Sequence, residues 1–288
     1  MEIGIEIQHY MTKKLYGSKC LNITYIIMKN TKKISSYEYQ YRNILKDILR
    51  MGHFRDDRTG VGCYSLFNES LKINLEDGFP LLTGRKMFEK TFKTEFDWFI
   101  NGETNIKRFQ DNGIKIWDAW ADENGDLGPV YGHQLRNFNS EYYDQLAILI
   151  NNLKTTPDSR RHIISLWNPL QIEEMALPPC YLYFQFFVEN DKLNMFVVQR
   201  SGDVFLGIPY DVALFSQILL YIAEQTGYVA SLLDIQIIDA HIYRNQIESV
   251  KQYLKQETFE LPKFDYKNGK LEITNYQHGP KITAAVAV

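Results

Sequence analysis

The stretch YLYFQFFVENDKLNMFVVQRS, residues 181–201, decides the fold of this chain. Two runs rich in aromatic and β-branched residues flank a short polar break at 189–192. Such runs are typical of β-strands, and a break of this length predicts a hairpin turn. The stretch therefore predicts two paired strands.

Other segments carry the patterns of further strands and helices. From 37 to 52, Tyr41, Ile44 and Ile48 recur at helical spacing, and Gly52 can end the helix. Further helices are predicted at 88–102, 142–154 and 210–227, and further strands at 61–75, 161–168 and 233–243. Helices and strands are mixed along the chain with no convincing linker, so residues 36–288 are predicted to form one α+β domain.

The first 35 residues differ from the rest in charge. Six lysines and no acidic residue lie between His9 and Tyr37: Lys13, Lys14, Lys19, Lys29, Lys32 and Lys33. We favour a basic, flexible extension over an arm that binds a polyanion. The net charge of the whole chain is −3, which gives no global attraction to nucleic acid or to an anionic membrane.

The three cysteines, Cys20, Cys63 and Cys180, lie far apart and form no CxxC pair. This spacing argues against a disulfide framework and a structural zinc site, and it favours a reducing compartment. The chain has no apolar run of membrane-spanning length and no signal-peptide pattern at its N-terminus. We therefore expect a cytoplasmic protein that binds no metal.

Cys180 lies directly before the first strand of the hairpin and follows Pro178 and Pro179. A lone cysteine at a strand start is more often a small buried side chain than a catalytic one. The prolines restrict the backbone, however, which suits a rigidly presented nucleophile. No histidine lies near Cys180 in the sequence, so a protease of the Cys–His type is unsupported.

Arginines occur at three short polar breaks, DDRTG (56–60), SRR (159–161) and QRS (199–201). They are Arg58, Arg160, Arg161 and Arg200. Each alone is explained by a surface salt bridge. Gathered in one site, they would clamp a phosphate and lower the pKa of a cysteine. Because no glycine-rich phosphate loop is present, side chains would have to hold the phosphate.

Three further features suit a flat, polar ligand. IWDAWADENGDLGPVYG (116–132) lacks EF-hand spacing, so aromatic platforms at Trp117 and Trp120 are favoured over a calcium loop. Glu95, in an apolar helix, is either a salt-bridged core acid or a general acid–base with a raised pKa. His241 and Tyr243 share one face of a strand and could bond a sugar hydroxyl.

Eight motifs closely resemble those of the thymidylate synthase family in content, order and spacing. They are DDRTG, GFPLLT, WFINGETN, IWDAWADENGDLGPVYG, PDSRR, MALPPC, QRSGDVFLGIPY and DAHIY. The resemblance runs from about residue 37 to the terminal AAVAV. It implies a mixed β-sheet packed by helices, 5,10-methylenetetrahydrofolate as cofactor, and a homodimer with shared active sites that requires neither membrane nor nucleic acid.

The resemblance also implies roles for single residues. Cys180 matches the nucleophile that adds to C6 of the pyrimidine, Glu95 matches the acid for proton transfers, and Tyr131 and Asp211 complete the catalytic set. The nucleotide site comprises Arg58, Gln199, Arg200, Ser201, Asp203, Asp211, His241 and Tyr243, with Arg160 and Arg161 supplied across the dimer. The folate pocket comprises Arg85, Ile116, Trp117, Trp120, Leu177, Asp203, Gly207, Tyr210 and Val288.

Two positions depart from the family's pattern. Tyr181 replaces the usual histidine after the cysteine, and Asp211 in GIPYD replaces the asparagine that reads the base. An amide donates to O4 of uracil and accepts from N3–H, whereas a carboxylate only accepts. Cytosine offers an amino donor at position 4, and a proton shared with its N3 would satisfy Asp211. A cytosine nucleotide is therefore expected, and the alternative is a protonated Asp211 that still accepts uracil.

Cytosine-reading members of this superfamily resemble phage deoxycytidylate hydroxymethylases, in which water quenches the exocyclic methylene. We therefore expect hydroxymethylation of dCMP, in a host's cytoplasm if the gene belongs to a phage. Methylation of dCMP and ordinary conversion of dUMP to dTMP follow as alternatives, because both tryptophans and the AVAV tail resemble those of hydride-transferring synthases. A protein that only binds nucleotide or RNA would need the arginines but not Cys180 or Glu95.

Overall fold

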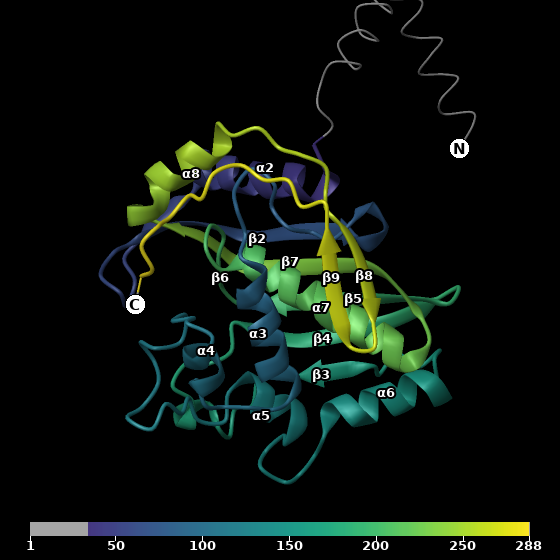
Figure 1. The fold of residues 1–288 in the computed structure, drawn as a ribbon. Coiled ribbons are helices and arrows are strands. Elements are labelled where there is room, and N and C mark those ends of the chain that lie inside the picture. The colour runs from purple at the N-terminus through teal and green to yellow at the C-terminus, as the bar shows by residue number, and fades with distance from the viewer. Residues whose placement is uncertain (1–33, 288) are drawn as a thin grey trace, which may run out of the picture. The chain divides into compact units, whose positions relative to one another are not determined.

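The structure, a computed structural model, describes residues 34–287, and those from Ser35 onward form one compact unit. The six lysines of the basic extension, Cys20 and Val288 lie outside the described residues. The centre of the unit is a seven-stranded sheet in the order β1-β2-β7-β5-β4-β3, with β6 beside β7 (Figure 1). The strands are β1 (His53–Arg55), β2 (Cys63–Asn74), β3 (Ile163–Ser165), β4 (Tyr181–Glu189), β5 (Lys192–Gln199), β6 (Gly202–Asp203) and β7 (Val229–Tyr243).

The sheet is mixed because β5 and β6 run parallel to β7, whereas its other neighbouring strands pair antiparallel. The predicted hairpin is present as β4 and β5, with Glu189 paired to Lys192. Asn190 and Asp191 between them have φ of 49° and 61°, the left-handed values that a two-residue turn needs. This turn sets the register of the two strands on which most of the site depends.

Helices pack against this sheet and against each other. They are α2 (Ser36–Met51), α3 (Glu89–Ile100), α4 (Lys107–Asp111), α5 (Tyr131–Arg136), α6 (Gln145–Thr155), α7 (Ile208–Thr226) and α8 (Ile247–Leu254). Short 3-10 turns occur at Leu75–Asp77, Ile172–Glu174 and Arg244–Gln246. Helix α7 packs on β5 and β7, and α3 packs on α7, while α2 covers β2 beside α8 (Figure 1). The predicted single α+β domain with a mixed sheet packed by helices is confirmed.

Local side chains explain where the helices begin and end. The Ser35 hydroxyl accepts a hydrogen bond from the Glu38 N–H (3.2 Å) at the start of α2, and Gly52 follows its end, as expected. The predicted start of α6 at residue 142 is wrong by three residues. Asp144 caps this helix by accepting from the Ala147 N–H (3.0 Å), and Tyr142 has a φ of 58° that no helix allows.

Two strands that the sequence reasoning missed form a separate small sheet. They are β8 (Lys263–Lys267) and β9 (Lys270–Thr274), joined through Asn268 and Gly269. In the main sheet, Phe184 and Val197 point into the core, while Phe187 on the opposite face is exposed. Among the described residues, no helix combines the length and the apolar character needed to cross a membrane.

Candidate active site

The backbone around Cys180 is held on both sides. The Cys180 N–H donates to the hydroxyl oxygen of Tyr131 (3.0 Å), and the Cys180 carbonyl accepts from the Arg200 N–H (2.8 Å). The Arg200 guanidinium donates to the carbonyls of Pro178 (2.8 Å) and Pro179 (2.9 Å). The proline turn is thus tied to the end of β5, and it presents a partly buried thiol.

The charges around the thiol only partly match the expectation. Burial raises the pKa of Cys180, and the Asp211 carboxylate adds to this. Arg200, the Tyr131 hydroxyl and Arg58 act in the opposite direction, as predicted for the arginines, but burial outweighs them. The pKa of Cys180 is thus raised in the described chain, whereas the prediction of a lowered pKa assumed all four arginines in one site.

Asp211 lies in the first turn of α7, close to the end of β5. The Nε2 amide group of the buried Gln199 donates to Asp211 Oδ2 (2.7 Å). Burial raises the pKa of Asp211 to about 7, with the Gln199 hydrogen bond acting to lower it and the charge of Asp203 to raise it. The carboxyl can therefore take up a proton near neutral pH.

Glu95 is buried on α3 and is the second acid of this site. Burial raises its pKa to about 8, the charge of Asp211 adds to the shift, and the nearby Trp117 indole opposes it. Glu95 makes no ion pair with any residue that the structure describes. Of the two interpretations of Glu95, the structure favours a buried acid with a raised pKa over a salt-bridged core residue.

Aromatic rings line the approach to these groups. Trp117 is buried, with ring centroids 5.8 Å from Tyr131 and 5.9 Å from Trp120. On its other side it stacks on Trp98 at 5.9 Å. The ring of Tyr131 thus lies between Cys180 and the tryptophans of the loop 116–132.

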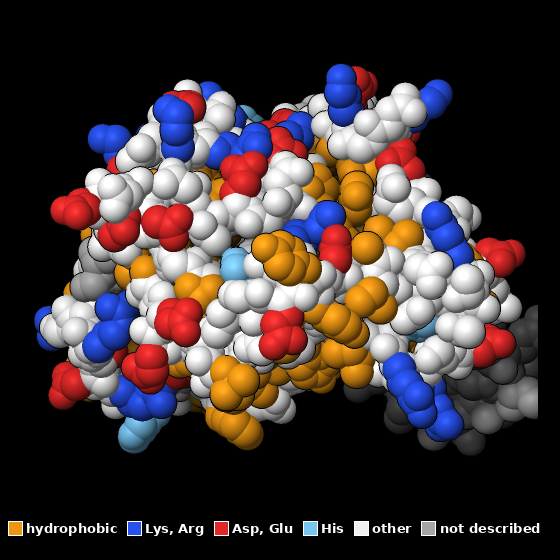
Figure 2. All heavy atoms as spheres, turned by 90° about the horizontal axis from the view of Figure 1, so that it is seen from below, with side chains coloured by type: hydrophobic (Ala, Val, Ile, Leu, Met, Phe, Trp, Pro, Cys, Tyr) orange, Lys and Arg blue, Asp and Glu red, His pale blue; other side chains and the backbone are white. Residues whose placement is uncertain are grey.

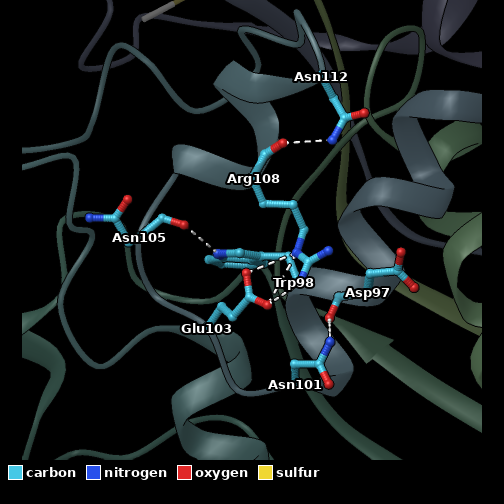
Figure 3. Close-up of polar contacts among 7 residues, drawn as sticks. All are labelled: Asp97, Trp98, Asn101, Glu103, Asn105, Arg108 and Asn112. Carbon is cyan, nitrogen blue, oxygen red and sulfur yellow. Dashed lines mark hydrogen bonds and ion pairs between the residues drawn. The ribbon is translucent and has the colours of Figure 1, made fainter.

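Trp98 is itself fixed by a polar network at the end of α3 (Figure 3). Its indole N–H donates to the carbonyl of Asn105 (3.1 Å). Arg108 on α4 binds both carboxylate oxygens of Glu103, with Nε donating at 2.9 and 3.1 Å, and Asn112 donates to the Arg108 carbonyl (2.9 Å). This network supports the tryptophan on which Trp117 rests.

The predicted sugar-binding pair lies at the end of β7. The rings of His241 and Tyr243 meet edge to face at 5.0 Å. Burial acts to lower the pKa of His241, but a hydrogen bond with Asp239 and the charges of Asp203 and Asp239 raise it above its usual value. Gln246 Nε2 donates to Asp203 Oδ2 (2.7 Å). Sequence reasoning missed Asp239 and Gln246, although Asp239, two residues before His241 on one strand, was a usable signal.

The four predicted arginines separate into two pairs. Arg58 and Arg200 lie close enough to Cys180 for their charges to act on its thiol. Arg160 and Arg161 are exposed between α6 and β3, and neither forms an ion pair within residues 34–287. The described chain therefore does not gather all four arginines in one site.

A family model described as thymidylate synthase matches residues 39–288. The chain belongs to the thymidylate synthase family. Membership implies folate-dependent transfer of a one-carbon unit to C5 of a pyrimidine nucleotide.

Thymidylate synthases use methylenetetrahydrofolate as cofactor and co-substrate, and the residues of this chain fit such a molecule. The Trp117 and Trp120 rings offer faces for a planar heterocycle. Of the other predicted folate residues, the buried Arg85 stacks on Phe205 (4.5 Å) and donates to its carbonyl (2.6 Å). Tyr210 and Leu177 are partly buried, Gly207 caps α7, and Ile116 is exposed. Ser201, predicted for the nucleotide, is partly buried next to Arg200.

Proposed function

We propose that this protein transfers a hydroxymethyl group to C5 of dCMP, with 5,10-methylenetetrahydrofolate as the one-carbon donor. The observation that carries this proposal is Asp211, a carboxyl group where the family's base reader is an amide. With a pKa raised to about 7 it can share a proton with N3 of cytosine and accept from the 4-amino group. An ionised Asp211 would instead face O4 of uracil with no proton between them.

In this proposal Cys180 is the nucleophile. Its sulfur bonds to C6, the C5–C6 double-bond electrons move into the C4–C5 bond, and the C4–N3 electrons are taken up at N3 by the proton shared with Asp211. C5 then becomes electron-rich, and methylenetetrahydrofolate, when bound, supplies the one-carbon electrophile. The Tyr131 hydroxyl, which accepts from the Cys180 N–H, keeps the sulfur in place during this step.

Glu95 is proposed as the group that moves protons at C5 and at the amino group on C4. Because its pKa is about 8, it is mostly protonated at neutral pH and can first donate a proton and later accept one. A hydroxymethyl product requires that C5 lose its proton, that tetrahydrofolate be released from the transferred carbon, and that water add to the resulting exocyclic methylene. The Cys180–C6 bond then breaks. A methyl product instead requires hydride from the folate.

Two observations support a homodimer with shared sites. Side chains on and beside β2, β3 and β4 leave apolar area exposed: Phe67, Ile163, Trp167, Leu170 and Phe187. Figure 2, seen from below, shows hydrophobic side chains gathered in a band between scattered charged groups. A second copy of the chain is the proposed occupant of the apolar area, because it would also bring Arg160 and Arg161 to the phosphate of its neighbour's nucleotide.

Each alternative activity has an observation of its own. Methylation of dCMP is favoured by Trp117 and Trp120, because their rings would shield a hydride transfer from water. Conversion of dUMP to dTMP is favoured by the pKa of Asp211, since a protonated carboxyl can donate to O4 of uracil. Incubation with methylenetetrahydrofolate and each nucleotide separates all three by product mass. Only the methylations also convert the folate to dihydrofolate.

The base assignment is tested by Asp211→Asn. The amide restores a donor for O4 and an acceptor for N3–H, so the preference should move from dCMP toward dUMP by roughly a hundredfold in kcat/KM. The matched control is Asp234→Asn on β7, which alters a surface carboxyl paired with Lys72. It should change kcat/KM neither for dCMP nor for dUMP. An Asp211→Asn enzyme with the unchanged wild-type preference would contradict the role of Asp211.

A further inference from the structure

Tyr181 and Gln199 carry two buried polar atoms whose partners are missing from the described residues. The Tyr181 hydroxyl and the Gln199 Oε1 carbonyl both lack a hydrogen bond within residues 34–287. Tyr181 is 3% exposed and Gln199 is fully buried. The two residues pair directly across β4 and β5, which places their side chains next to each other on one face of the sheet.

The two atoms have complementary chemistry. A phenol hydroxyl can donate, whereas an amide carbonyl can only accept. Burial raises the pKa of Tyr181 well above its usual value, and the charges of Tyr131, Glu95 and Asp211 add to this, so the phenol remains a donor. The structure shows no direct hydrogen bond between the two atoms. Because buried polar groups in native proteins find partners, one water molecule between them would satisfy both the hydroxyl and the carbonyl.

The ring of Tyr181 is rigidly placed for this contact. Its centroid lies 4.5 Å from Tyr131, 5.0 Å from Phe215 and 5.7 Å from Phe184. A side chain packed on three sides has no room to change rotamer. The position of the hydroxyl is therefore set by the aromatic core.

The other end of the Gln199 amide reaches the base reader. Gln199 Nε2 donates to Asp211 Oδ2 (2.7 Å). If the Gln199 carbonyl is matched to the Tyr181 hydroxyl, the side-chain amide cannot flip by 180°. Its N–H therefore continues to face Asp211 Oδ2. An oxygen that accepts from an N–H is the poorer place for a proton, and the proton of Asp211 is therefore directed to Oδ1.

Which oxygen of Asp211 carries the proton matters because cytosine and uracil have opposite donor and acceptor groups at positions 3 and 4. Cytosine presents an acceptor at N3 and a donor at position 4, and uracil presents a donor at N3 and an acceptor at position 4. A protonated carboxyl with a free choice of oxygen could satisfy either base. A carboxyl whose donor and acceptor oxygens are fixed satisfies only one of them.

We propose that Tyr181 is a positioning residue for base selection, which acts through Gln199 to fix which oxygen of Asp211 carries the proton. The inference rests on the proposed role of Asp211 in reading the base. It assigns a function to the departure at position 181, where the family usually has histidine. It also explains how a carboxyl with a pKa near 7 can discriminate between two bases when it is protonated.

The test is the ratio of kcat/KM for dCMP to that for dUMP in Tyr181→Phe. This change keeps the packed ring and removes only the hydroxyl, and the ratio should move toward one by about tenfold. Tyr181→His should retain part of the ratio because its ring N–H can still donate. Tyr266→Phe, which removes another buried unpartnered hydroxyl, on β8, should leave the ratio unchanged.

A double-mutant cycle shows whether Tyr181 acts through Gln199. If it does, adding Tyr181→Phe to Gln199→Met should not change the ratio further. Equal losses of kcat/KM for both nucleotides in Tyr181→Phe, or additive effects in the cycle, would overturn the inference and leave the proposed function standing. A wild-type preference for dUMP would instead contradict the proposed function, and the Tyr181→Phe ratio would still decide the role of Tyr181.

Discussion

Cys180 and Asp211 lie at two ends of one site, and the two ends differ in how closely they follow the family. Around Cys180, Tyr131 and Arg200 both match the family's pattern, and both form hydrogen bonds with the Cys180 backbone. Two positions depart from that pattern: Asp211 itself, and Tyr181, which follows Cys180 in the chain but pairs with Gln199 across β4 and β5. Gln199 lies between these two departures.

This difference has a physical reason. In the proposed reaction, attack at C6 needs the same thiol in the same place for any pyrimidine. Few changes in the residues that position Cys180 are therefore compatible with it. Base reading depends only on the order of donors and acceptors, and that order changes with one amide or carboxyl. We infer that the reaction was retained at one end while the selected base changed at the other.

The largest effect is expected at the retained end. Cys180→Ala should reduce kcat by roughly 10⁴-fold or more, because no other group can add to C6. Binding of dCMP should persist, since it rests on the arginines and the base pocket. Cys63→Ala, a change at another buried cysteine, on β2, is the control and should remain active. Near-normal turnover by Cys180→Ala would remove the covalent step from the account.

A smaller effect on kcat is expected for Glu95, the proposed proton-transfer group. Glu95→Gln should lower kcat by roughly 10²–10⁴-fold. The wild-type rate should also fall as the pH rises through about 8, where Glu95 loses its proton, and any residual activity of the variant should lack this decline. Asp97→Asn on the same helix is the matched control. A wild-type rate that is flat across this range would exclude Glu95 as the general acid.

Mixed dimers test whether the part of the site around Cys180 is completed by arginines from the second subunit. Arg160→Ala and Cys180→Ala should each be nearly inactive, and a one-to-one mixture should recover about a quarter of wild-type activity, because half the dimers carry one intact site. Activity is measured after the heterodimer has been verified by mass. No recovery in verified heterodimers would show that each subunit builds its own phosphate site.

The smallest effect concerns folding stability. Glu95 and Asp211 have raised pKa values of about 8 and about 7, so the folded protein binds more protons than the unfolded chain at mildly acidic pH. Their contribution is fully present below the unfolded pKa values, and it is lost progressively as the pH rises from about 4 to the folded values of about 7 and about 8. Urea unfolding should therefore show stability falling over this range, and Glu95→Gln should flatten the decline. An equally steep decline in the variant would contradict the assignment of the pKa shift.

Much of the fold could be predicted from local patterns. The turn at Asn190 and Asp191 followed from its polar break between two strand patterns, and α7 followed from its long apolar run. The β8–β9 hairpin was missed although Asn268-Gly269, with φ of 51° and 71°, is a strong turn signal. The first turn of α6 was overpredicted because the apolar pattern does not show which residue caps a helix.

The link between Tyr181 and Gln199 could not be predicted in the same way. The turn pairs Glu189 with Lys192, and counting back along a regular hairpin would place Tyr181 opposite Arg200. A bulge between Tyr181 and Tyr183 shifts the register by one residue and brings Gln199 opposite Tyr181 instead. Such a bulge reverses which side chains share a face, and an alternating pattern of apolar residues does not reveal it.

The most direct test of the central claim is the specificity of the wild-type enzyme. With saturating methylenetetrahydrofolate, kcat/KM is measured for dCMP and for dUMP under the same conditions. A carboxyl base reader predicts that dCMP is preferred by roughly a hundredfold or more, as expected from a few kcal/mol in the transition state. A preference for dUMP would contradict the claim and make this protein an ordinary thymidylate-forming enzyme with an altered base reader.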